Sequence, residues 1–178
     1  IDGTAFRANG NGAVLLFGFG DNSTVRGTAI VGGALGVMIQ ASSNVTIDGN
    51  WIGTSDGTTA NGNRMIGVYL GGGGGVDAAG IRITNNVIVS NDNGIYTTTF
   101  DGSHMVTGLT VSGNKIGVGA DGTTALGNTS AGINLDSWTR NSTFSGNTIA
   151  NNGTWGMTVG NPLVASPGAT ANIISRNS

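Results

Sequence analysis

Residues that could carry acid-base, nucleophilic or metal chemistry are few in this sequence and lie far apart. The 178 residues include no cysteine, a single histidine, His104, and nine acidic residues, all of them aspartate. Without cysteine there is neither a disulfide framework nor a thiolate metal site. His104 follows Asp101 in a turn-like stretch, and no serine or cysteine motif accompanies it as a nucleophile. The sequence therefore predicts no catalytic residue, no metal site and no cofactor.

Two of the aspartates, Asp56 and Asp121, open the same pentapeptide, Asp-Gly-Thr-Thr-Ala. Carboxylates beside carbonyl oxygens can bind calcium, but neither copy has a second acid close by in the sequence. Asp-Gly is also a common turn dipeptide, because the aspartate side chain bonds to nearby backbone and glycine accepts left-handed conformations. We interpret both aspartates as turn residues.

An internal repeat positions these residues. Its first signal is the pattern apolar-x-Gly-Asn-x-Ile. The asparagine position is occupied by Thr28, Asn50, Asn86, Asn114 and Asn147, with a last remnant at Asn172. Successive positions are 22, 36, 28, 33 and 25 residues apart. Constant short elements joined by loops of variable length are typical of a solenoid whose rungs stack on one another.

A second signal, Gly-apolar-x-apolar, alternates with the first. It begins at Gly36, Gly67, Gly94, Gly132 and Gly156. Apolar and polar residues alternate around these signals, as strands require. Glycine occurs 34 times, glutamate is absent and only one lysine is present, a composition that disfavours helices. We predict an all-β fold, a right-handed parallel β-helix of about six rungs, with residues 1–178 forming a single domain.

The repeat also explains why one stretch of the sequence is written twice. Residues 56–70 and 121–135 agree at nine of fifteen positions. Each copy lies between the first and second signals, where other repeats use about half the distance. We therefore predict one outward loop, inserted in alternate rungs. Inside the rungs, we expect Asn50, Asn86, Asn114 and Asn147 to stack as an amide ladder.

One outward column contains a candidate charged pair. Arg26 and Asp48 fall at equivalent positions of adjacent rungs. The pair is either part of a catalytic site or an exposed ion pair, and exposed pairs are common and contribute only about 0–1 kcal/mol. We favour the ion pair.

The outward aromatic residues are the stronger candidates for ligand contact. Tyr69 and Tyr96 fall on neighbouring rungs, about 4.8 Å apart, and are candidates for stacking against sugar rings. Trp51 is a third candidate on another face, beside Val87 and Lys115. The alternative is that these residues serve the strands alone, because aromatic side chains are favoured there.

Charge and hydropathy exclude two kinds of partner. The formal net charge is −2 and there is no basic cluster, so we expect no nucleic-acid partner. The longest nearly apolar run, residues 29–39, is too short to span a bilayer, so we expect no membrane insertion.

The stretches NSTVRGTAI, NVTIDGNWIGTSDGTTANGNRMIGVYL and LTVSGNKIGVGADGTTALGN resemble the right-handed parallel β-helix repeats of large bacterial secreted and cell-surface proteins, within the pectate-lyase-like superfamily. The resemblance implies an extracellular or cell-surface location, a glycan-rich setting, and a chain that is a segment of a longer solenoid. It does not select one function, because that superfamily includes lyases, hydrolases, epimerases and adhesins.

Three hypotheses follow from the sequence. The first is a non-catalytic spacer and adhesive surface with a polysaccharide or cell-surface glycan as partner. The second is a polysaccharide-active enzyme of the lyase or epimerase type, with its groove partly outside this chain. The third is a filament subunit that self-associates end to end through uncapped strands.

Overall fold

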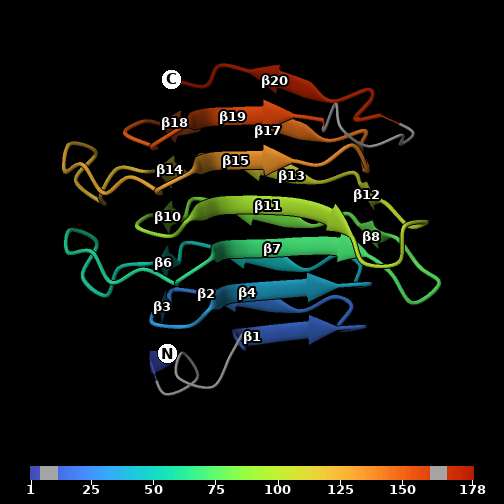
Figure 1. Ribbon diagram of the computed structural model, residues 1–178, viewed down its shortest axis with the longest axis horizontal. Helices are drawn as coiled ribbons and strands as arrows, with labels where there is room; N and C mark the ends of the chain where they lie inside the picture. Colours follow the sequence, from blue (N-terminus) through green and yellow to red (C-terminus); the bar gives the residue numbers. More distant parts are fainter. Residues whose placement is uncertain (5–11, 161–167) are drawn as a thin grey trace.

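The computed structural model describes residues 1–4, 12–160 and 168–178, which wind as a stack of rungs (Figure 1). In Figure 1 the front strands run from left to right, the rear strands return, and the chain climbs from the N-terminus to the C-terminus. This sense of winding is right-handed. Each named element in these ranges is a strand, and no helix there is long and apolar enough to cross a membrane.

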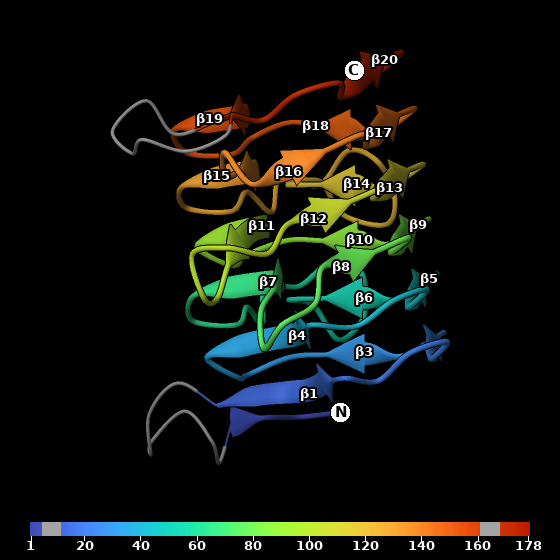
Figure 2. The same cartoon turned by 90° about the vertical axis from the view of Figure 1, so that its right-hand side faces the viewer.

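The strands form four sheets that run along the axis of the stack, and their pairings are parallel (Figure 2). Sheet 1 contains β1 (Ala13–Gly18), β4 (Leu35–Gln40), β7 (Ile66–Gly72), β11 (Asn93–Thr99), β15 (Ala131–Leu135) and β19 (Trp155–Val159). Sheet 2 contains β2 (Thr24–Arg26), β5 (Thr46–Asp48), β9 (Arg82–Thr84), β13 (Thr110–Ser112), β17 (Thr143–Ser145) and β20 (Ile173–Ser175).

Two smaller sheets, of five and three strands, contain the remaining strands. Sheet 3 contains β3 (Ala29–Ile30), β6 (Trp51–Ile52), β10 (Val87–Ile88), β14 (Lys115–Ile116) and β18 (Thr148–Ile149). Sheet 4 contains β8 (Ala78–Ala79), β12 (Val106–Thr107) and β16 (Thr139–Arg140). The chain therefore passes from sheet 1 through sheet 2 to sheet 3 in each turn, which confirms the predicted parallel β-helix.

The core is a set of aliphatic columns inside the tube. In sheet 2, Ile47, Ile83, Val111 and Phe144 pair in register and are fully buried. Sheet 1 contributes a matching inward set that includes Ile133. Full burial of such a side chain stabilises the fold by about 1.5–3 kcal/mol. The inward positions predicted from the alternation of apolar and polar residues are confirmed.

The predicted asparagine ladder is present at the turn from sheet 2 to sheet 3. Each side-chain amide donates to the amide oxygen of the next rung, at 3.1 Å from Asn50 to Asn86 and 2.9 Å from Asn114 to Asn147. The ladder extends one rung beyond the four predicted members, and the assignment of Asn172 to the asparagine position of the repeat was wrong. Asn147 donates to Asn177, at 2.8 Å, whereas Asn172 accepts the backbone N–H of Ser142.

A second ladder, which the sequence analysis missed, lies at the turn from sheet 3 to sheet 1. It joins Asn63, Asn91, Asn128 and Asn152 through amide hydrogen bonds of 3.0, 3.1 and 2.9 Å. Two of its members are the asparagines of the Gly-Asn pairs at 62–63 and 127–128. Buried amides that satisfy one another in this way fix the height of each rung.

The second sequence signal begins with glycine because neighbouring rungs approach too closely for a side chain. A Cβ on Gly94 would lie 2.5 Å from the carbonyl oxygen of Gly132 and 3.0 Å from the amide nitrogen of Asn128. Gly36, Gly67 and Gly132 meet the same obstruction from the next rung. The column of glycines therefore allows the strands of sheet 1 to pack closely against the asparagines of the second ladder.

The connections from sheet 3 to sheet 1 alternate in length, as predicted. The long ones are residues 53–65 and 117–130, and the short ones are 31–34, 89–92 and 150–154. In the long loops Asp56 and Asp121 accept backbone N–H groups two and three residues later, at 2.7–2.9 Å. The backbone N–H of Thr58 is the main cause that lowers the pKa of Asp56 below its usual range. For Asp121 the main cause is the Thr124 hydroxyl, which donates to it at 2.6 Å, followed by the backbone N–H groups. Both aspartates are turn residues, as interpreted from the sequence.

Candidate functional site

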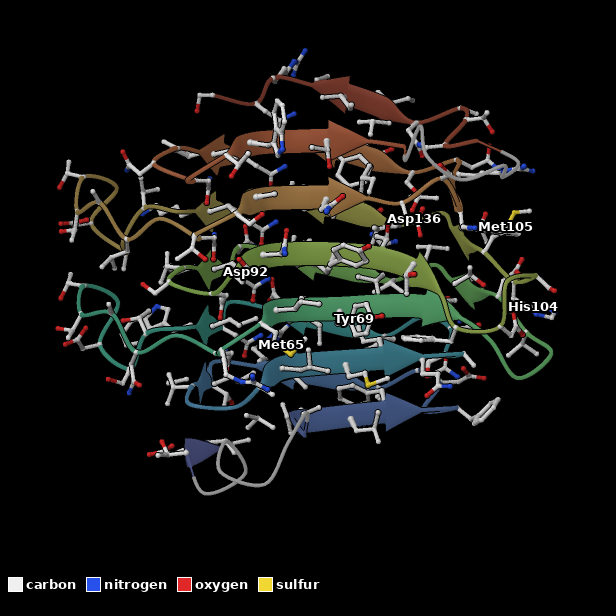
Figure 3. The ribbon with its side chains drawn as sticks, viewed as in Figure 1. Met65, Tyr69, Asp92, His104, Met105 and Asp136 are labelled. Atoms are coloured by element: carbon white, nitrogen blue, oxygen red, sulfur yellow. The ribbon has the colours of Figure 1, made fainter. Side chains whose placement is uncertain are left out.

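The outer face of sheet 1 carries the two tyrosines singled out in the sequence. The outward column runs through Met38, Tyr69, Tyr96, Asn134 and Thr158. Tyr69 lies on β7 (Figure 3). The Tyr69 and Tyr96 rings have centroids 5.7 Å apart and planes tilted by 60°, and Phe100 packs edge-on against Tyr69 at 5.2 Å. The two tyrosines therefore do not form one flat platform, and Tyr69 is engaged within the aromatic cluster.

Tyr96 instead borders a groove of about 290 Å³ on the last three rungs. We call it the Tyr96–Trp155 groove; it is lined by Tyr96, Ser130, Asn134, Asp136, Trp155, Thr158 and Gly160. Tyr96 belongs to β11 and Trp155 to β19, with β15 between them in sheet 1. Thr158, three residues after Trp155, is the β19 residue in register with Tyr96. The two aromatic residues therefore lie at opposite corners of a polar floor, about two strand spacings apart across the sheet and about 10 Å apart along it.

Polar groups of the floor are held by hydrogen bonds that leave some of their capacity unused. The Thr158 hydroxyl donates to the Asn134 side-chain oxygen at 2.8 Å, so the amide nitrogen of Asn134 is available to a ligand. Asp136 accepts the backbone N–H of Ser137 at 2.6 Å and the Thr98 hydroxyl at 3.3 Å. Burial, and after it the charge of Asp136, raise the pKa of Tyr96, so its hydroxyl stays protonated.

The sequence analysis missed Trp155 and Asp136 as members of this site. Asp136 directly follows β15, one position beyond the Gly-apolar-x-apolar signal, and Trp155 stands one position before that signal in β19. Extending the register by one residue at each end of the signal would have placed both residues on the strands next to that of Tyr96, at opposite ends of the signal. Their convergence also depends on side-chain directions that the register alone does not give.

Trp51 lies apart from the tyrosines, on sheet 3, and pairs with Val87, whose other neighbour is Lys115, as predicted. It is 37% exposed and lines a groove of about 360 Å³ with Gly27, Thr28, Ala29, Gly49 and Ser55. Among these lining residues Trp51 is the single aromatic and none is ionisable. This groove therefore offers less directional recognition than the Tyr96–Trp155 groove.

Arg26 and Asp48 form an ion pair with a separation of 3.1 Å, and the Arg26 side chain is 71% exposed. The Asp48 carboxylate also accepts the Thr84 hydroxyl at 2.7 Å and the Asn85 amide at 2.9 Å. Its oxygens are thus engaged in linking three successive rungs. The pair is the exposed ion pair that we favoured.

His104 lies at the connection from β11 to β12 (Figure 3). Its Nδ1 is 2.7 Å from Asp101, whose other oxygen accepts the backbone N–H groups of Ser103 and His104 at 3.0 Å. The contact between Nδ1 and Asp101 orients the imidazole ring. No third acid, histidine or cysteine of the described ranges joins them in a group able to hold a metal ion.

The stacked parallel rungs and the outward groove define this chain as a right-handed parallel β-helix repeat protein. Within that class it belongs to the NosD family: residues 1–178 match the family described as periplasmic copper-binding protein (NosD). The family is periplasmic by this description, which agrees with the expected location outside the bacterial cytoplasm. No curated protein and no solved structure matches the chain.

The copper in the family description prompts a test of the residues present. Copper sites are built from several imidazole, thiolate or thioether ligands, and this chain has one histidine, no cysteine and four methionines. Met157 packs against the core, and the Met65 sulfur lies 3.8 Å from the Arg64 guanidinium. Because no third acid, histidine or cysteine of the described ranges joins His104 and Asp101, these residues do not fit a copper centre built from several imidazoles or thiolates.

Proposed function

We propose that this chain is a non-catalytic segment of a periplasmic or cell-surface β-helix, which acts as a stiff spacer and contacts carbohydrate through the Tyr96–Trp155 groove. The groove is the observation that carries the proposal. Two aromatic side chains flank an amide, a carboxylate and two hydroxyls. Aromatic faces cover the apolar side of a sugar ring, while planar polar groups bond to its hydroxyls.

The charge chemistry of the groove supports binding without turnover. Asp136 is the single carboxylate among the lining residues. Glycoside hydrolysis uses two carboxylates on opposite sides of the scissile bond, and lyase or epimerase chemistry needs a positioned base. The polysaccharide-active enzyme is therefore the weaker hypothesis for this chain.

Binding to a panel of soluble oligosaccharides tests the proposal. In NMR or calorimetric titrations we expect millimolar to micromolar binding of at least one oligosaccharide. Trp155→Ala should weaken it by roughly threefold to tenfold, since an aromatic contact contributes about 0.5–1.5 kcal/mol. Trp51→Ala, which removes an exposed aromatic residue from the other groove, is the matched control and should leave the affinity unchanged.

Two results would reject the proposal. One is the release of reducing or unsaturated ends from any oligosaccharide of the panel, which would establish an enzyme. The other is the absence of binding across the panel, or binding that Trp51→Ala weakens and Trp155→Ala does not.

End-to-end self-association is a second candidate, favoured by the outer rungs of the described stack. β1 and β20 each have a partner strand on one side only. Leu16 and Phe19 at one end, and Ile173 and Ile174 at the other, are exposed. Light scattering at increasing protein concentration tests it: growing mass supports association through these edges, and a constant monomer mass rejects it.

A further inference from the structure

The Tyr96–Trp155 groove carries negative charge without a compensating base. In the described part of the chain, no lysine, arginine or histidine lines it. Asp136 contributes a carboxylate to its wall. We infer that the groove selects sugars by charge, favouring amino sugars over neutral sugars and disfavouring uronic acids. This inference rests on the proposed carbohydrate contact.

The Asp136 carboxylate is held in place by its neighbours. The Ser137 N–H at 2.6 Å and the Thr98 hydroxyl at 3.3 Å both donate to it. Its charge reaches the aromatic residues of the same face, because it contributes, after burial, to the raised pKa of Tyr96. A ligand held between Tyr96 and Trp155 would experience the same field.

The size of the effect follows from Coulomb's law. In water, the attraction between two opposite charges about 5 Å apart raises the binding affinity about fourfold over that of an uncharged ligand. The factor is larger where protein displaces water. A protonated amino sugar gains this factor and a uronate loses it. Salt weakens both effects, because the Debye length shrinks to about 3 Å at 1 M.

Three oligosaccharides of equal length test the inference: a glucosamine oligomer, a neutral glucose oligomer and a galacturonate oligomer. At low salt we expect affinity to fall in that order, by about fourfold or more at each step. Asp136→Asn keeps the shape of the side chain and removes its charge. It should lower the affinity for the glucosamine oligomer and raise the affinity for the galacturonate oligomer. The affinity for the neutral oligomer should change by less than about twofold.

Asp56→Asn is the matched control, because it makes the same charge change in a long loop that does not line the groove, and asparagine also supports that turn. It should leave the order of affinities unchanged. The salt dependence of the wild-type protein provides a second measurement that needs no variant.

Equal or tighter binding of the galacturonate oligomer by the wild-type protein would overturn the inference, as would a preference that survives in Asp136→Asn. Such results would leave the proposed function standing, provided that Trp155→Ala still weakens binding. The absence of binding for all three oligomers would reject the proposed function itself.

Discussion

Asn114 is buried in the middle of the first amide ladder, where it joins three rungs. Its amide nitrogen donates to Asn147 at 2.9 Å and to the carbonyl oxygen of Ile83 at 2.8 Å, and its oxygen accepts the Asn86 amide at 3.0 Å. A single side chain of this kind satisfies backbone groups that the sharp turn would otherwise leave buried and unpaired.

Replacing this residue should therefore be costly. Asn114→Ala leaves at least two buried polar groups without a partner, and each costs about 1–3 kcal/mol. We expect urea denaturation to show a free energy of unfolding lower by about 2–6 kcal/mol. Asn61→Ala, in an exposed part of a long loop, is the control and should change it by less than about 0.5 kcal/mol. Equal losses in the two variants would contradict the ladder's role.

Copper binding is also decided at the residue scale. Because His104 is the one imidazole of the chain, we expect copper(II) titration to show at most one weak site. Electron paramagnetic resonance should show a single nitrogen ligand at that site, which His104→Ala removes. Stoichiometric binding that withstands a competing chelator, or that survives His104→Ala, would contradict our reading of the ligand set.

At the scale of the strand, the glycines that open the sheet 1 signal allow neighbouring rungs to stack closely. The atoms that a Cβ on Gly94 would strike are the Gly132 carbonyl oxygen, the Asn128 amide and the Ile116 side chain. The Gly132 carbonyl belongs to the backbone of the paired strand β15, and the Asn128 and Ile116 side chains are buried. None of them can move aside without disturbing the second ladder.

Gly94→Ala should accordingly lower the free energy of unfolding by about 1–3 kcal/mol, the usual cost of overpacking. Gly18→Ala is the matched control, because a Cβ at Gly18, at the end of β1, would meet nothing within 4 Å. Thermal melts of the two variants make the comparison. A Gly94→Ala protein as stable as the wild type would show that sheet 1 can open at this position.

Sequence reasoning succeeded where one residue type has one physical role per rung. Asn50, Asn86 and Asn114 recur at the same bend, so their ladder could be predicted. It failed at the ends of the repeat, where Asn172 matched the pattern better than Asn177 although the latter completes the ladder. The Tyr96–Trp155 groove was out of reach because its walls come from three rungs and depend on where individual side chains point.

At the scale of the whole molecule, stability comes from inward columns that extend through successive rungs. Ile47 is fully buried and pairs in register with Ile83 above it and Val25 below it. Each rung of such a column is stabilised by contacts with the rungs above and below it, so a defect in one rung also destabilises its neighbours.

Ile47→Asp should therefore unfold the stack, because it exchanges about 1.5–3 kcal/mol of apolar burial for a buried charge. We expect loss of the β-sheet circular dichroism signal at room temperature or a strongly lowered melting temperature. Asp48→Asn, the adjacent outward position, is the control and should keep the fold. An unchanged melting curve for Ile47→Asp would show that its side chain does not face the lumen.

The two long loops are two rungs apart, yet they touch: the backbone N–H of Ala120 donates to the carbonyl oxygen of Gly57 at 2.7 Å. The short connection 89–92 lies between them in the chain and leaves room for this contact. Removal of one rung would bring two long loops onto neighbouring levels, where both would need the same space. Duplication or deletion of rungs in pairs keeps the alternation, so length variation in such a stack is expected to proceed by even numbers.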